Sequence, residues 1–138
     1  MTDLVRMSMT IERPLYDKLN ALVEKKGAVN RSEFVRDLIR DRLVAEAWEG
    51  NDVALGTVTL LYDHHTRGLG DRLTDIQHDH HTDVLAATHI HLSHDICAEV
   101  IIIRGEADRI RSIADRMGRL KGVLHAALSM SAPGEALR

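Results

Sequence analysis

The sequence has few cysteines and aromatic residues and no long apolar stretch. Its single cysteine excludes an internal disulfide, and a free thiol suits the reducing cytoplasm. Aromatic residues make up only 3% of the 138 residues against 44% hydrophobic residues, so the core must be aliphatic. No apolar stretch reaches the roughly 18 residues of a membrane span, and residues 1–10 lack the apolar run of a signal peptide. We therefore expect a soluble cytoplasmic protein with no membrane partner.

The chain also lacks a strong charge of either sign. Its net charge of −3 does not by itself indicate binding to nucleic acid. Residues 1–50 are neutral, so residues 51–138 carry this negative charge. The length allows one ordinary domain or two small ones.

Histidine, in contrast, is crowded into one part of the chain. Residues 77–97 hold six of the nine histidines and the only cysteine. Core packing does not explain this concentration of imidazoles around one thiol. The composition is typical of a site for a borderline-soft divalent metal.

The spacing of the ligands supports a metal site. Residues 84–92 are apolar and rich in β-forming residues, so they predict a strand. Side chains alternate along a strand, which places His89 and His91 on one face about 7 Å apart. Two imidazoles at this distance can converge on one ion.

A tight turn over residues 92–95 and a second strand over 96–104 would form a hairpin. An antiparallel return would place Cys97 beside His91. One hairpin would thus supply two imidazoles and a thiolate, and the Gln77–His81 tract can supply a fourth ligand. Taken singly, the remaining histidines near this tract fit solvated side chains or weak secondary ligands: His64, His65, His80, His81 and His94. We assign no role to His125.

The first part of the chain predicts a strand followed by two helices. Leu4–Ile11 predicts a strand in which polar and apolar side chains alternate from Arg6 on, with Arg6, Ser8 and Thr10 on the polar face. A lone strand cannot satisfy its backbone hydrogen bonds, so we expect it to pair with a second copy of the chain. Such a ribbon enters the DNA major groove in ribbon-helix-helix proteins, where those three side chains would face base edges.

Helix signals follow this strand. Pro14 suits the first turn of the first helix, and Gly27 suits its C-terminal end. The apolar pattern of the second helix ends near Trp48. Asn30 or Ser32 can cap the second helix, whose N-terminus, with Arg31 nearby, would offer N–H groups to a DNA phosphate. The alternative to a ribbon-helix-helix domain is an ordinary helical hairpin with an unpaired edge strand.

Two acidic residues lie four apart on the second helix. Glu33 and Asp37 would repel each other unless something compensates their charges. Pairing with Arg36, Arg40 or a neighbouring chain is one explanation, and a cation site is the other.

Residues 49–52 form a polar break that predicts a linker between domains. The pattern after it predicts strand, helix, strand, strand, helix and strand, which is the ferredoxin-like βαββαβ plan of an α+β protein. The predicted domains are a ribbon-helix-helix domain over 1–48, a metal-binding domain over 53–131 and a flexible tail over 132–138.

Five motifs together resemble the nickel-responsive transcriptional regulator family (NikR type), and the resemblance runs from Arg6 to about Met130. They are Asn30-Arg31-Ser32-Glu33, Tyr62-Asp63-His64, Gln77-His78, His89-Ile90-His91 and His94-Asp95-Ile96-Cys97. The resemblance implies a homotetramer in which two DNA-binding dimers flank four ACT-like metal domains that hold the tetramer together. It also implies repression of nickel-uptake genes by the nickel-bound protein at its operator DNA.

The resemblance further implies roles for particular residues. His89, His91 and Cys97 of one chain, with His78 of a neighbouring subunit, would hold Ni(II) in a square plane. Arg6, Ser8 and Thr10 fall where the family reads bases, although the family usually has threonine where Ser8 stands. Glu33 and Asp37 match acidic residues that hold a second cation, often potassium (K+). Two further histidines resemble positions of weaker metal binding: His64 and His80.

Other functions compete with this one. A regulator of the same build could sense copper or zinc; a square plane suits Ni(II) or Cu(II), whereas Zn(II) prefers a tetrahedron. An antitoxin-like DNA-binding module with a protein-binding second domain is another alternative. We expect no enzyme, because the sequence has no His-Glu-x-x-His element and four protein ligands leave a metal no place for substrate.

Overall fold

The computed structural model describes residues 3–138, so the first two residues of the predicted DNA-binding domain lie outside the described residues. The chain packs into two compact units, and the boundary between them falls between Arg40 and Asp41. This boundary lies inside helix α2 (Arg31–Glu49) rather than in the polar break that follows it.

Both helices predicted for the first part of the chain are present, and they begin and end where the sequence predicted. Helix α1 (Arg13–Lys26) has Pro14 in its first turn and ends at Gly27, whose φ of 68° is left-handed and favours glycine. Helix α2 follows Asn30, whose Oδ1 accepts a hydrogen bond from the backbone N–H of Glu33 at 2.8 Å. Asn30, rather than Ser32, is therefore the cap.

The strand predicted at Leu4–Ile11 is absent from this single chain, where residues 3–12 have no regular secondary structure. The physical reason is that a strand needs a neighbour for its hydrogen bonds and its apolar side. Of residues 3–40 only Phe34 is buried, and Met7 and Met9 are 71% and 69% exposed. One copy of this segment thus leaves most of its apolar surface in water.

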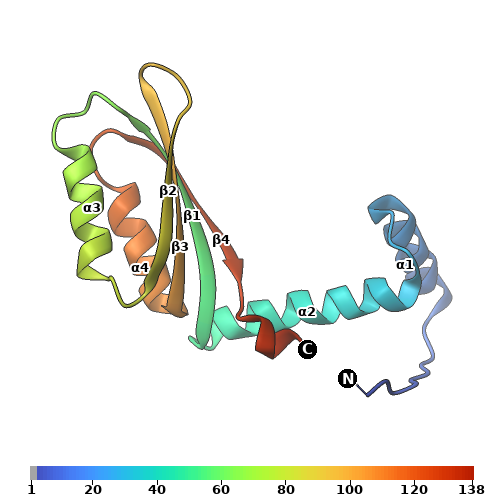
Figure 1. The fold of residues 1–138 in the computed structure, drawn as a ribbon. Coiled ribbons are helices and arrows are strands. Elements are labelled where there is room, and N and C mark those ends of the chain that lie inside the picture. Colours follow the sequence, from blue (N-terminus) through green and yellow to red (C-terminus); the bar gives the residue numbers. More distant parts are fainter. Residues whose placement is uncertain (1–2) are drawn as a thin grey trace. The chain divides into compact units, whose positions relative to one another are not determined.

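The second unit confirms the predicted βαββαβ order and the α+β class. Its elements are β1 (Val53–Asp63), α3 (Leu69–Asp79), β2 (Val84–His91), β3 (Ile96–Glu106), α4 (Ala107–Gly118) and β4 (Val123–Ser131). The strands form one sheet in the order β2-β3-β1-β4, and every neighbouring pair is antiparallel. Helices α3 and α4 lie against the same face of this sheet (Figure 1).

Alternation along β1 explains how the two layers join. Every second residue of the strand, from Ala54 to Tyr62, is buried toward the helices. Leu73 and Ile76 of α3 and Ile110 of α4 are buried against them, and the core is aliphatic as expected. Among the described residues, no helix combines the length and apolar character that a membrane crossing requires.

The ends of the second unit are also held in place. The indole N–H of Trp48, near the end of α2, donates a hydrogen bond to the carbonyl of Ser131 at 2.8 Å. The predicted flexible tail, residues 132–138, contains a short 3₁₀ helix, η1 (Gly134–Leu137). The first residue of the tail, Ala132, is buried.

Candidate metal centre

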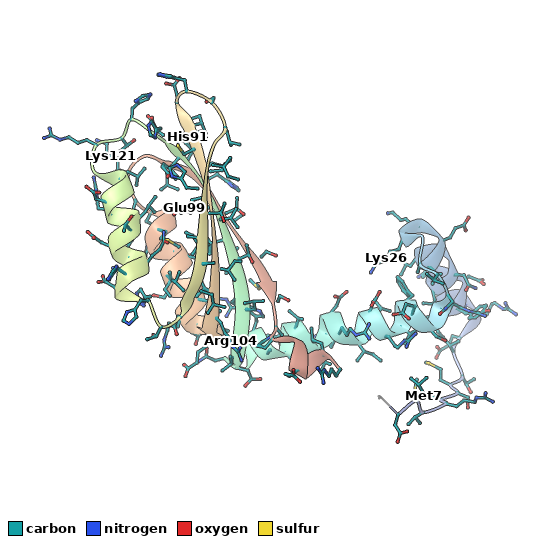
Figure 2. The ribbon with its side chains drawn as sticks, viewed as in Figure 1. Met7, Lys26, His91, Glu99, Arg104 and Lys121 are labelled. Carbon is teal, nitrogen blue, oxygen red and sulfur yellow. The ribbon has the colours of Figure 1, made fainter. Side chains whose placement is uncertain are left out.

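The β2–β3 hairpin forms because its turn satisfies its own backbone groups. The Ser93 hydroxyl accepts hydrogen bonds from the N–H groups of Asp95 at 3.3 Å and Ile96 at 3.1 Å. The register that follows pairs His91 directly with Cys97, as the antiparallel return predicted. Figure 2 shows His91 close to the turn and Glu99 further along the sheet.

Cys97 is the centre of the group. Its side chain is fully buried, and its Sγ lies 3.4 Å from Nδ1 of His91 and 3.4 Å from Nδ1 of His64. The ligand atoms of these three residues all lie within 4.8 Å of one another. A thiol and two imidazoles at this separation can close on one divalent ion of the borderline-soft class by small rotations.

His64 comes nearer to the thiol than its place in the sequence suggested. It directly follows β1, whose last residues pair with the first residues of β3: Tyr62 with Cys97, and Asp63 with Ile96. The backbone N–H of His64 donates to the carbonyl of Asp95 at 2.7 Å, which ties this loop to the hairpin turn. The Tyr62-Asp63-His64 motif was therefore the sequence signal for placing His64 near the metal site. Its distance from the thiol, however, depends on the pairing of β1 with β3, which the sequence alone does not show.

His89 shares the face of His91, and the two rings lie 4.9 Å apart. Its Nε2 lies 3.4 Å from the hydroxyl of Tyr62, and its ligand atoms do not fall within the Cys97 group of the described chain. Burial raises the pKa of Tyr62 to about 12, and electrostatic interactions with Glu99 and Cys97 contribute less to this rise. The Tyr62 hydroxyl therefore keeps its proton beside the imidazole at neutral pH.

His78 lies in the last turn of α3, exposed, with its ring 6.4 Å from that of His81. Within the described chain, no ligand atom of His78 joins the Cys97 group. His80, expected as a weaker ligand, has its Nε2 3.0 Å from the guanidinium of Arg116. The roles of both histidines stay predictions.

The predicted DNA-reading residues divide between loop and helix. Arg6, Ser8 and Thr10 are exposed in the irregular segment before α1. Asn30 caps α2, and the exposed Ser32 lies in its first turn.

Arg31 is occupied within its own unit. Its guanidinium contacts the Tyr16 hydroxyl and lies 5.1 Å from the centre of that ring. A hydrogen bond with Asn20 and the contact with Arg31 lower the pKa of Tyr16.

The acidic pair on α2 has cationic neighbours in this chain. Glu33 contacts Arg36, and Arg40 lies 3.0 Å from Asp37 and 3.8 Å from Glu33. Lys26 approaches Asp37 to 3.9 Å. Pairing with arginine and lysine thus compensates the two carboxylates, and the potassium site stays a prediction.

Comparison with known proteins matches both parts of the chain. Residues 5–46 match the ribbon-helix-helix protein family of the copG type, and residues 55–131 match the NikR C-terminal nickel-binding domain. These two matches define the class, a ribbon-helix-helix protein with a nickel-binding domain.

Full-length relatives make the assignment more specific. A protein from Solibacter usitatus is 44% identical over 100% of both chains, and one from Geobacter sulfurreducens is 46% identical over 99% of both. Both carry the name nickel-responsive regulator. This chain belongs to the nickel-responsive regulator family.

A solved structure shares the fold of part of this chain. An uncharacterised protein from Thermotoga maritima superimposes with a TM-score of 0.52 at 11% identity, over 57% of this chain and 98% of its own. At this identity the likeness concerns the fold alone.

Proposed function

We propose that this protein is a repressor of nickel-uptake genes whose binding to operator DNA is switched on by nickel. The ligands would be His89, His91 and Cys97 of one chain and His78 of a neighbouring subunit, in a square plane. The observation that carries the proposal is the buried thiol of Cys97, 3.4 Å from His91 Nδ1, with the ring of His89 adjacent to that of His91.

The donor set fits nickel chemically. Imidazole nitrogens and a thiolate suit borderline and soft divalent ions, and a cysteine ligand must lose its proton to bind. Metal binding should therefore release a proton and weaken in acid. Copper would bind the same donors more tightly by the general affinity order, so geometry and metal supply must contribute to selectivity.

Surfaces that one chain leaves open support the proposed oligomer. Residues 3–40 bury only Phe34, which is too little for so short a segment to fold alone. A second copy would pair the segments around Arg6, Ser8 and Thr10 into the DNA-reading ribbon. Two such dimers, joined through their metal domains, make the proposed homotetramer.

The switch would act through His78. A ligand from a neighbouring subunit ties α3 of one chain to the hairpin of another only while the metal is bound. That tie would favour the spacing of the two ribbons that fits two operator half-sites. A coupling on the order of 1–3 kcal/mol would change operator affinity about 5- to 150-fold. A potassium ion at Glu33 and Asp37 would require the arginine and lysine contacts there to rearrange.

The decisive test compares four variants by nickel–thiolate absorption and by operator gel shift. Cys97→Ala and His89→Ala should lose both the absorption and the nickel-dependent shift. His64→Ala should keep both, and His125→Ala is the matched control for removing an exposed histidine. If His64→Ala abolishes the absorption while His89→Ala keeps it, the third imidazole is His64 and the proposed ligand set is wrong.

The identity of the metal needs a separate measurement. Operator binding should be followed in buffered series of Ni(II), Cu(II) and Zn(II), at free concentrations set by chelators. Activation by copper or zinc at a lower buffered concentration than nickel, under cell-like buffering, would contradict nickel as the effector.

A further inference from the structure

Among the residues that the structure describes, Asp83 is the only buried charged residue, and it lies in the connection between α3 and β2. A buried carboxylate destabilises the fold unless a cation compensates its charge. Its partner is Arg109 in the first turn of α4, whose Nη1 lies 3.2 Å from Oδ1 and 3.1 Å from Oδ2 of Asp83. The Asp83–Arg109 pair therefore joins the α3–β2 connection to α4.

The backbone around Asp83 is attached as well. The carbonyl of Asp83 accepts a hydrogen bond from the N–H of Arg104 on β3 at 2.9 Å, and its own N–H donates to the carbonyl of His80 at 2.9 Å. A Cβ on Gly105 would lie 3.3 Å from the carboxylate of Asp83, so β3 passes close to this group. Asp83 is thus fixed to β3 and α4 and is hydrogen-bonded to the residue that follows α3.

The segment that Asp83 holds carries the predicted ligand His78. This histidine lies in the last turn of α3, and its carbonyl accepts a hydrogen bond from the N–H of His81 at 3.2 Å. Elsewhere α3 is held by the apolar side chains that it buries, namely Leu69, Leu73 and Ile76. Apolar burial is non-directional, so the orientation of the C-terminal end of α3 depends on the directional contacts of Asp83.

The α3–β2 connection and the thiol lie at opposite ends of the sheet (Figure 1). Val84, at the start of β2, pairs with Ile103, whereas His91, at its end, pairs with Cys97. At the usual rise per residue these two ends of β2 are about 23 Å apart. The hairpin that carries the thiol therefore does not position His78 of its own chain.

We propose that Asp83 and Arg109 are positioning residues, which hold the C-terminal end of α3 so that His78 is presented to the nickel site of a neighbouring subunit. This inference rests on the proposed function, in which His78 is the fourth ligand. Without the pair, the end of α3 samples more orientations, and the cost of ordering His78 offsets more of the binding free energy. Nickel affinity should then fall although the three ligands of the hairpin are unchanged.

The test measures Ni(II) affinity of the full-length protein by competition with a chelator, with nickel–thiolate absorption as the signal. Arg109→Met should weaken nickel binding about tenfold, which is the lower end of the range for residues that orient metal ligands. Asp83→Asn keeps the shape of the side chain but not its charge, and should weaken binding to a similar degree. Arg109→Lys keeps the positive charge and should retain most of the affinity.

Asp108→Asn is the matched control. It removes an exposed ion pair with Arg111 on the same helix, at 3.5 Å, and should bind nickel as the unsubstituted protein does. Equal nickel affinity of Arg109→Met, Asp83→Asn and Asp108→Asn would overturn the proposal. Circular dichroism checks that each variant is folded, and Asp83→Asn carries the same comparisons if Arg109→Met does not fold.

A double-mutant comparison separates positioning of His78 from a general loss of stability. In a His78→Ala background, Arg109→Met should have no further effect on nickel affinity, because the side chain that it positions is absent. A further loss of about tenfold in that background would show that Arg109 acts on the whole fold, and would overturn the proposal.

Hydrogen exchange of the metal-free protein separates failure of this proposal from failure of the proposed ligand set. Exchange over residues 77–84 should be faster in Arg109→Met than in the unsubstituted protein, with strands β1 and β4 unchanged. Unchanged exchange over residues 77–84 would overturn the positioning role whether or not nickel binds as proposed. Absence of nickel–thiolate absorption from the unsubstituted protein would instead contradict the proposed ligand set.

Discussion

Replacing Gly56 with alanine tests how closely helix α4 approaches the sheet that carries the metal ligands. A Cβ at this position would lie 2.7 Å from Ile110 Cγ2, 3.1 Å from Leu128 Cδ1 and 3.4 Å from the Trp48 ring. Real Cβ atoms essentially never approach a neighbour to 2.7 Å, and Ile110 is fully buried and cannot swing into solvent. The substitution must therefore push α4 or its side chains away from β1.

The magnitude follows from two opposing effects. Overpacking a tight core costs about 1–3 kcal/mol. Relieving the entropic cost of glycine in a strand returns roughly 0.5–1 kcal/mol. The 2.7 Å approach to Ile110 places the overpacking cost in the upper part of its range, at about 2–3 kcal/mol. With about 1 kcal/mol of entropic relief, Gly56→Ala should lower the free energy of unfolding by about 1–2 kcal/mol. For a domain of this size the unfolding temperature should fall by about 4–8 °C per kcal/mol, or about 4–16 °C in all.

Thermal unfolding of the metal-free protein, followed by circular dichroism, provides the assay. Gly70→Ala is the matched control because a Cβ there meets nothing within 4 Å, and Gly70 lies in helix α3. Alanine should stabilise that helix by up to about 1 kcal/mol. An unfolding temperature of Gly56→Ala equal to or above that of the unsubstituted protein would refute the close-packing argument.

Two further predictions concern the helix cap and the tyrosines. Asn30→Ala removes the acceptor for the Glu33 N–H and should lower the free energy of unfolding, measured by chemical denaturation, by about 1 kcal/mol. Asn30→Asp should restore that stability. An Asn30→Ala variant as stable as the unsubstituted protein would contradict the cap. Tyr16, whose pKa is lowered first by its hydrogen bond with Asn20, should ionise before Tyr62, whose pKa is raised to about 12 by burial. Between pH 10 and 12 the folded state holds the Tyr62 proton more tightly than the unfolded state, so stability should fall as pH rises through that window. Tyrosinate absorbance checks the order: Tyr62→Phe should remove the later transition, and loss of the earlier one would sink the assignment.

The hairpin could be predicted from local sequence because its determinants are local. Two strand patterns, a four-residue turn and the period-2 alternation together specify that His91 faces Cys97. The βαββαβ order could be read in the same way from the apolar spacing of each segment. These features depend on residues close together along the chain.

The neighbours of Cys97 were less accessible from sequence. Whether His64 or His89 lies nearest to the thiol depends on how the end of β1 pairs with the start of β3. Those two segments are separated along the chain by a helix and a strand. The same pairing assembles His65 with Asp95, which no spacing rule connects.

By itself, the order of the residues determined the helices, the strands of the metal domain and a histidine-rich hairpin with one thiol, because these depend on propensity and periodicity within short segments. Only the tertiary structure decided which imidazoles meet that thiol and which gather at the surface, because contacts between distant segments follow from strand order and register in the folded sheet. The segment Leu4–Ile11 shows the same division: its alternation from Arg6 on predicts a strand, but a strand forms only where a second strand supplies its hydrogen bonds.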